Sequence, residues 1–118
     1  MESKSLDLCK GLLGKEVRIL IDRPLGSKHP KWNFKYTVNY GYVPGIIAPD
    51  GEELDAYVLN VDYPVKEYSG IVVAIVHRLE NDDDKIVIIP ENSKISDQEI
   101  ETTVEFQEKW FKHSIIRK

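Results

Sequence analysis

The sequence predicts a mainly β fold in which five short strands form a small closed barrel and one α-helix follows them. Five segments rich in β-branched and aromatic residues are separated by Pro, Gly, Asn and Asp. After residue 95 the apolar residues change to helical spacing. The chain has 118 residues, of which 42% are hydrophobic. We therefore expect one domain with one core, spanning residues 1–118.

The N-terminal third begins with a leucine-rich stretch, residues 1–14, that predicts either a short helix or a loosely packed arm. From Val17 to Ile21 apolar residues alternate with others, which is typical of a half-buried strand. A proline and a glycine end this strand. Residues 23–35 then form an irregular basic loop.

Four further strands are predicted, over residues 36–43, 54–61, 70–79 and 85–89. The segment 70–79 is an almost continuous apolar run, which indicates a strand covered on both faces. Because only a few residues separate the last two strands, we expect them to form a hairpin.

The C-terminal helix is predicted from about residue 97 to 112. Ser96 and Glu99 have the spacing of a capping box. Ile100, Val104 and Phe111 follow helical spacing, and an apolar stripe of this kind packs a helix against a core.

Composition narrows the function classes. Nothing approaches eighteen consecutive apolar residues, so no membrane span is expected. The single Cys9 excludes an intrachain disulfide and a multi-cysteine zinc site, and a cytoplasmic protein is the simplest interpretation. Residues 1–44 carry eight Lys/Arg and four Asp/Glu, whereas residues 45–118 carry eight and sixteen. This uneven distribution of charge suits the binding of a metal together with an anion. It argues against nucleic-acid binding, which needs a continuous basic face.

The most informative stretch is acidic. Asp50, Glu52, Glu53 and Asp55 fall within six positions, after a turn-prone Pro-Asp-Gly. Carboxylates this close repel one another unless they are solvated, splayed apart or neutralised by cations. Mg²⁺ takes oxygen ligands, including carboxylates, waters and substrate phosphates. The stretch therefore predicts either a metal site for phosphate chemistry or a solvated turn.

Two other groups could share this chemistry. Residues 82–84 are three aspartates followed by Lys85, which is either a solvated hairpin tip or a set of metal ligands beside a phosphate-binding lysine. Arg23 and Lys28 flank a glycine turn and could bind anions, although no P-loop motif is present.

Taken together, these motifs resemble those of the soluble family I inorganic pyrophosphatases. The family's Asn-Tyr-Gly-Tyr strand is present at residues 39–42, and its Asp-Gly-Asp-Pro-x-Asp signature corresponds to residues 50–55. An Asp-x-Lys before a strand that ends in proline corresponds to residues 83–85 and Pro90. The resemblance implies a five-stranded OB-like barrel that hydrolyses pyrophosphate to two phosphates with several Mg²⁺ ions.

The resemblance also implies roles for individual residues. Tyr40 and Lys85 would contact phosphate, and Asp55 would hold Mg²⁺ near the attacking water. The remaining metal ligands would be Asp50, Glu52, Asp83 and Glu80. With Arg23 and Lys28 on the substrate, these residues make up the expected site.

The chain also departs from the family pattern. It is shorter than usual members, it has Glu52 and Glu53 where the signature has Asp and Pro, and it lacks the family's C-terminal Tyr-Lys pair. The alternative is therefore a catalytically weak or inactive module that binds metal and a phosphate ligand. A homo-oligomer is possible, with an interface supplied by exposed aromatic residues such as Trp32, Tyr63, Tyr68 or Trp110.

Overall fold

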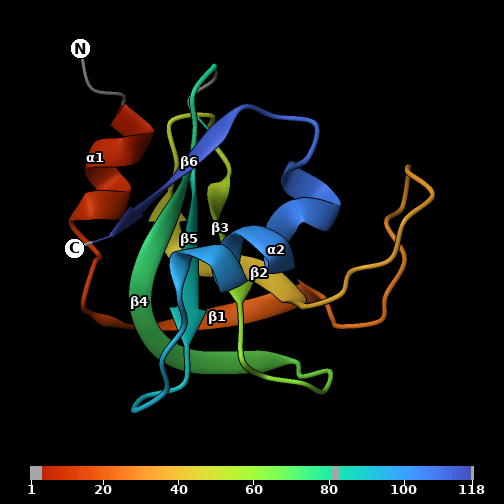
Figure 1. Ribbon diagram of the computed structural model, residues 1–118. Coiled ribbons are helices and arrows are strands. Elements are labelled where there is room, and N and C mark those ends of the chain that lie inside the picture. The colour runs from red at the N-terminus through yellow and green to blue at the C-terminus, as the bar shows by residue number, and fades with distance from the viewer. Residues whose placement is uncertain (1–3, 81–82, 118) are drawn as a thin grey trace.

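The computed structural model describes residues 4–80 and 83–117. These residues form two helices and six strands (Figure 1). In chain order the elements are α1 (Lys4–Lys10), β1 (Glu16–Arg23), β2 (Asn39–Ile47), β3 (Glu53–Val58), β4 (Glu67–Arg78), β5 (Lys85–Ile89), α2 (Asp97–Glu108) and β6 (His113–Arg117).

The first five strands close into a barrel. They are hydrogen-bonded in the order β1-β2-β3-β5-β4, and β4 pairs in turn with β1. Only β3 and β5 are parallel, and the other pairs are antiparallel. The predicted five-stranded barrel with a C-terminal helix is confirmed, as is the β4–β5 hairpin, whose tip at residues 81–82 lies outside the described residues.

β4 closes the barrel because it is long and bent (Figure 1). Its first residues pair with β1, and its later residues pair with β5 and β6. Gly70 lies at the crossing, where a Cβ would come within 2.5 Å of the Ile89 carbonyl oxygen. A register shift between Val72 and Ala74 adds a bulge, which increases local twist.

The elements differ from the prediction at several boundaries and by one additional strand. β2 continues through Pro44 and Gly45 to Ile47, with a register shift that accommodates this pair. α2 ends at Glu108 rather than 112, and Trp110 is 59% exposed instead of extending the apolar stripe. β6 was not expected, because a five-residue segment whose two isoleucines are adjacent has no alternating pattern and gives little strand signal without its partner β4.

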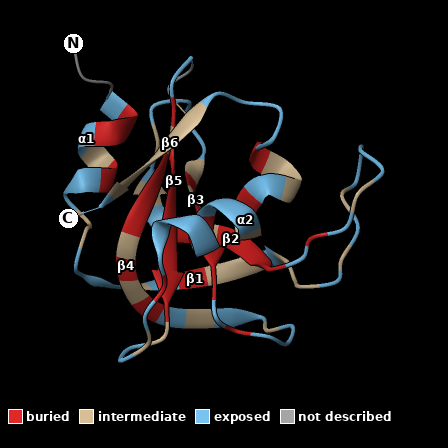
Figure 2. Ribbon diagram, viewed as in Figure 1, coloured by how far each residue is buried: buried red, intermediate tan, exposed pale blue. Residues whose placement is uncertain are grey.

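Two apolar clusters lie on opposite faces of the strands. One cluster fills the barrel and draws residues from every barrel strand, together with Leu6 and Cys9 of α1. The other lies between the outer face of the sheet and α2, where Ile100 and Val104 are fully buried. Figure 2 shows these buried positions along the strands, with the outer faces of both helices exposed. The predicted capping box is present at the start of α2, with Ser96 and Glu99 exchanging hydrogen bonds of 3.1 Å.

Strand alternation positions the site. In β3, Leu54, Ala56 and Val58 point into the barrel, so Asp55 and Tyr57 project from the outer face beside α2. α2 covers the apolar part of this face and leaves its polar end accessible.

Candidate active site

Lys85 is at the centre of the polar end of the sheet. Its ammonium nitrogen lies 2.9 Å from Asp55 Oδ2 and 2.8 Å from Asp83 Oδ1. The Lys85 side chain is only 4% exposed, whereas those of Asp55 and Asp83 are 38% and 36% exposed. Because β3 and β5 run parallel with Ala56 opposite Ile86, the two preceding residues, Asp55 and Lys85, also lie side by side. The structure thus brings together three residues that the sequence separates into two motifs.

Tyr40 of β2 lies next to this group. Its ring packs 4.9 Å from that of Tyr57, in a T-shaped arrangement. Burial, and then the negative charge of Asp55, raise the pKa of Tyr40 well above its ordinary value. The hydroxyl therefore stays protonated beside Asp55, with which it also forms a side-chain hydrogen bond.

The packing of β2 against β1 explains why the Asn-Tyr-Gly-Tyr motif has a glycine at position 41. A Cβ on Gly41 would lie 1.9 Å from the carbonyl oxygen of Leu20, so no other residue fits between β2 and β1. This close approach positions Tyr40 and its neighbour Asn39. Asn39 is fully buried, and its carboxamide binds the loop backbone at Leu25, Tyr63 and Val65.

The end of β1 supplies one more carboxylate and a cation. Desolvation raises the pKa of Asp22, the positive charge of Arg23 opposes that shift, and the charge of Asp55 adds to it. Arg23 also lies near Tyr36. Burial raises the pKa of Tyr36, and the positive charge of Arg23 opposes that shift. Tyr36 in turn stacks on Tyr40 at 5.5 Å between ring centroids. Arg23, which the sequence placed on the substrate, therefore lies near the same aromatic wall.

A buried network supports the site from behind. Arg78, the last residue of β4, donates from Nε and Nη2 to the two oxygens of Glu108, at 3.0 Å each. Its third nitrogen, Nη1, donates to Asp83 Oδ2 at 3.0 Å. Tyr57 donates to Glu108 at 2.6 Å, and burial followed by the Glu108 charge raises the pKa of Tyr57 well above its ordinary value. The network fixes Asp83, and through it Lys85, to α2.

Arg78 and Glu108 were not predicted from the sequence. Glu108 follows Ile100 and Val104 at four-residue spacing, so it lies on the buried stripe of α2, where a carboxylate needs a partner. Arg78 ends an apolar strand and is 6% exposed. The sequence did show one positive and one negative residue, each on an otherwise apolar element. That these two residues pair depends on the tertiary fold.

The family model described as inorganic pyrophosphatase matches residues 15–115. The chain belongs to the inorganic pyrophosphatase family. Among curated proteins, no sequence matches the chain significantly.

Solved pyrophosphatase structures share the fold. The inorganic pyrophosphatase from Coxiella burnetii superposes with a TM-score of 0.70 at 18% identity, over 89% of this chain and 88% of that one. The inorganic pyrophosphatase from Ehrlichia chaffeensis superposes with a TM-score of 0.69 at 17% identity, over 89% of this chain and 87% of that one. The Neisseria gonorrhoeae enzyme gives 0.60 at 22% identity, over 76% and 70%. The expected family and its barrel are therefore confirmed, and the family supports an inorganic diphosphatase-like hydrolase.

In this pyrophosphatase fold the acidic turn makes local hydrogen bonds. Asp50 Oδ1 accepts a hydrogen bond from the Glu52 amide at 2.9 Å, and both side chains are exposed. Glu53 accepts from the Gly45 amide at 2.8 Å. Within residues 4–80 and 83–117, no hydrogen bond or ion pair joins Asp50 or Glu52 to Asp55. Their assignment as metal ligands stays a prediction.

The remaining expected residues make contacts with residues outside the site. Glu80 is exposed and its carboxylate lies 3.4 Å from the ammonium of Lys112. Lys28 is exposed in the basic loop, where its backbone pairs with that of Lys35. Asp82 lies outside the described residues. Asp84 turns away from the site, because its Oδ1 is bound by His77 Nδ1 and the Arg78 amide, each at 2.9 Å.

The carboxylates of the site fit a divalent ion only if a bound ligand supplies further oxygen atoms to the same ion. In the described part of the chain, no group of three or more His, Cys, Asp or Glu could hold a metal unaided. Both oxygens of Asp83 already bind cations, Lys85 and Arg78. Asp22 and Asp55, by contrast, repel each other. Mg²⁺ commonly binds one or two carboxylates together with water and substrate phosphates, which is the set available here.

Proposed function

We propose that this chain hydrolyses inorganic pyrophosphate to two phosphates with Mg²⁺ as its cofactor. The observation that carries the proposal is the Asp55–Lys85–Asp83 group, with Tyr40 beside it, on a pyrophosphatase barrel. The matched solved structures are pyrophosphatases by their descriptions. The group combines a cation and a protonated donor, both nearly buried, with two carboxylates that are more than a third exposed.

Each residue has a role in this reaction. Lys85 supplies positive charge to a phosphate oxygen, and Tyr40 donates a hydrogen bond to another. Asp55 orients the attacking water and accepts its proton, while Arg23 faces the outer phosphate. The new bond joins the water oxygen to phosphorus, the bridging P–O bond breaks, and the bridging oxygen leaves with the second phosphate.

Asp55 and Asp22 are the residues that would hold Mg²⁺. When bound, the ion neutralises phosphoryl charge and acidifies water. Phosphoryl transfer depends mostly on positioning and electrostatic stabilisation, so carboxylates, a lysine and a tyrosine are sufficient protein groups.

The test is phosphate release from pyrophosphate with and without Mg²⁺, on wild type, Asp55→Asn and Asp62→Asn. The last variant removes the same charge from an exposed loop position outside the site. We expect Mg²⁺-dependent release that is lost in Asp55→Asn and retained in Asp62→Asn. Equal release from all three proteins would reject Asp55 as the centre of the site.

A second function, binding of a phosphate ligand without turnover, is favoured by one observation. Lys85 and Arg78 already neutralise Asp83, which leaves fewer carboxylates for metals than several Mg²⁺ ions require. Mg²⁺-dependent binding of pyrophosphate by calorimetry, without phosphate release, would establish this function instead.

A further inference from the structure

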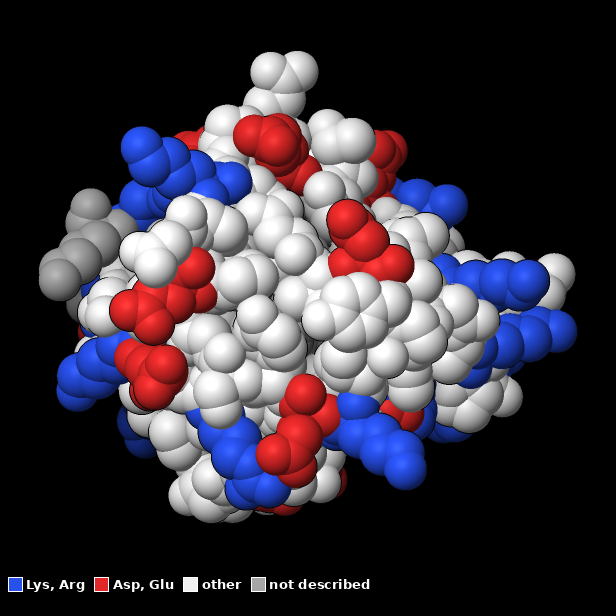
Figure 3. Space-filling view, turned by 90° about the horizontal axis from the view of Figure 1, so that it is seen from below, with Lys and Arg blue, Asp and Glu red and all other residues white. Residues whose placement is uncertain are grey.

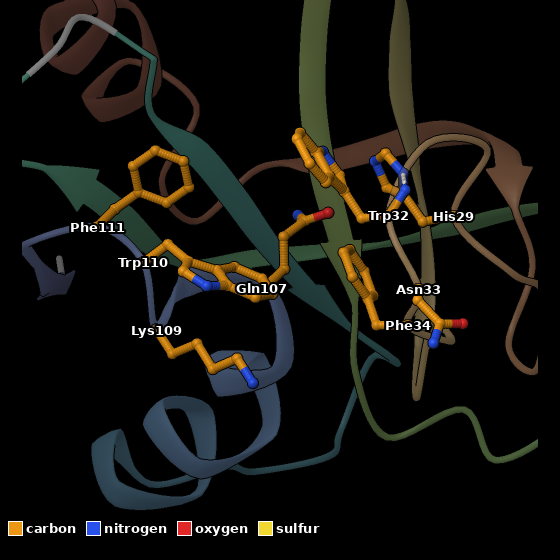
Figure 4. Close-up of a pocket in the computed structure, with 8 residues that line it drawn as sticks. All are labelled: His29, Trp32, Asn33, Phe34, Gln107, Lys109, Trp110 and Phe111. Atoms are coloured by element: carbon orange, nitrogen blue, oxygen red, sulfur yellow. Dashed lines mark hydrogen bonds between the residues drawn. The ribbon is translucent and has the colours of Figure 1, made fainter.

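A pocket of about 580 Å³ opens between the loop of residues 24–38 and the C-terminal end of α2 (Figure 4). Its volume falls within the range of roughly 300–1,000 Å³ that is typical of small-molecule sites. Five ring-bearing residues line it: His29, Trp32, Phe34, Trp110 and Phe111. An inorganic phosphate or pyrophosphate has no apolar surface to place against them.

The two tryptophans face the pocket from different walls (Figure 4). Trp32 comes from the loop and is 63% exposed, and Trp110 follows α2 and is 59% exposed. Exposed aromatic faces of this kind are platforms on which planar bases stack. Asn33 also lines the pocket, and its carboxamide carries both donors and acceptors for the edge of a base.

The pocket shares a wall with the proposed active site. Gln107 lines the pocket, accepts a hydrogen bond from the Tyr36 hydroxyl at 2.9 Å and donates to Tyr57 at 2.7 Å. The Phe34 ring lies 5.6 Å from that of Tyr36, which stacks at 5.5 Å on Tyr40. A ligand in the pocket is therefore two aromatic rings away from the tyrosine beside Asp55.

Lysines lie on the pocket and on the loop that forms one of its walls. Lys109 lines it, and the loop carries three exposed lysines, Lys28, Lys31 and Lys35. Figure 3 shows Lys and Arg side chains gathered at the edge of the molecule where this loop projects in Figure 1. An aromatic pocket with a lysine in its wall, next to the proposed phosphate site, fits a ligand that has a planar ring at one end and phosphates at the other.

We propose that the pocket binds the base of a nucleoside di- or triphosphate whose terminal phosphates lie at Lys85 and Tyr40. The inference rests on the proposed function and names a substrate class for the same site. In the reaction, a water oxygen bonds to the terminal phosphorus and the bridging P–O bond breaks. The bridging oxygen keeps the electron pair and leaves with the shortened nucleotide, and Asp55 accepts the proton of the water.

The test compares matched ligands with and without a base, in the presence of Mg²⁺. Calorimetry would measure the binding of β,γ-methylene nucleoside triphosphates with each of the four common bases, and of methylenediphosphonate as the base-free counterpart. Stacking on an aromatic side chain corresponds to a preference of about tenfold or more. We expect at least one nucleotide analogue to show it.

Variants identify the residues responsible. Trp32→Ala and Trp110→Ala should each remove most of the preference for the nucleotide analogue. Tyr63→Ala is the matched control, because Tyr63 is 62% exposed and does not line the pocket. Circular dichroism on each variant would confirm that the fold is retained. A preference that survives both tryptophan substitutions would overturn the proposal.

Phosphate release from pyrophosphate, measured on the same preparations, separates the two proposals. Release from pyrophosphate without any base preference rejects the nucleotide pocket and leaves the proposed function in place. A base preference without release supports the pocket and rejects the hydrolysis. Sedimentation would compare the molar mass of Trp32→Ala with that of wild type in solution. If the molar mass changes and the base preference does not, the aromatic residues form a contact between copies of the chain, and the nucleotide pocket is rejected.

Discussion

Arg78 and Glu108 form a buried, bidentate ion pair in which two guanidinium nitrogens each lie 3.0 Å from a carboxylate oxygen. Their side chains are 7% and 0% exposed. The pair joins the end of β4 to the end of α2, and Phe111 covers the guanidinium at 3.8 Å. It holds the helix against the sheet at the point where the sheet becomes polar.

Replacing Glu108 by Gln should lower the free energy of unfolding by about 3–5 kcal/mol, because the buried guanidinium of Arg78 loses its fully buried counter-charge and keeps only Asp83, whose side chain is 36% exposed. Urea denaturation of wild type and variant measures this. The exposed Arg18–Glu67 pair is the control, and Glu67→Gln should change stability little, since both side chains are more than half exposed. Similar effects at both positions would contradict the argument.

The double variant Arg78→Met, Glu108→Met tests the same pair differently. Removing both charges together leaves no unpaired ion, so it should be less destabilising than Glu108→Gln alone. It also removes the partner that holds Asp83, and phosphate release should fall even if stability is regained. Full stability with unchanged release would show that the network does not support the site.

Replacing Gly41 by Ala should destabilise the fold by at least about 3 kcal/mol, because backbone atoms of β1 would have to move. The added Cβ would lie 1.9 Å from the Leu20 oxygen. Gly11→Ala is the matched control: its nearest contact would be 3.5 Å, and its stability should stay within about 1 kcal/mol of wild type. Thermal unfolding of both variants decides the comparison.

The sequence predicted the parts of the site that reside in short motifs. Tyr40, Asp55, Asp83 and Lys85 each lie in a local pattern, and the structure brings them together. Asp50 and Glu52 lie in an equally strong pattern, but the turn directs them to solvent.

Long-range partners left a weaker signal in the sequence. The Arg78–Glu108 pair spans thirty positions, and β6 exists because its register places Ile116 opposite Ile75 of β4. Neither relationship has a local periodicity. The sequence therefore predicted most strands, the C-terminal helix and the residues of the short motifs. The ion pair behind the site depends on how the elements pack, so it was not predicted.

His113 should make stability depend on pH. Burial alone would lower its pKa, but hydrogen bonding to the Phe111 carbonyl and interaction with Glu101 outweigh burial, so the pKa is raised. A raised pKa means that the stabilisation is fully present below the unfolded value, about 6.5, and is lost as pH rises through the folded value.

Urea unfolding at a series of pH values checks this expectation. The loss of stability above about pH 6.5 should be smaller in His113→Gln than in wild type. His29→Gln is the control, because desolvation lowers the pKa of His29 and its contribution has the opposite sign. An unchanged pH dependence in His113→Gln would contradict the assignment.

Lys85→Gln should reduce pyrophosphate hydrolysis by on the order of 10²–10³-fold, the usual cost of losing one electrostatic contact to the reacting group. It should also leave Asp55 and Asp83 without the cation that they share. Divalent ions can replace that charge, so Mg²⁺ should raise the melting temperature more in Lys85→Gln than in wild type. Lys66→Gln removes an exposed lysine outside the site and should match wild type in both measurements. If Lys85→Gln keeps its activity, or if Mg²⁺ stabilises it no more than wild type, Lys85 does not neutralise the site in the way its geometry indicates.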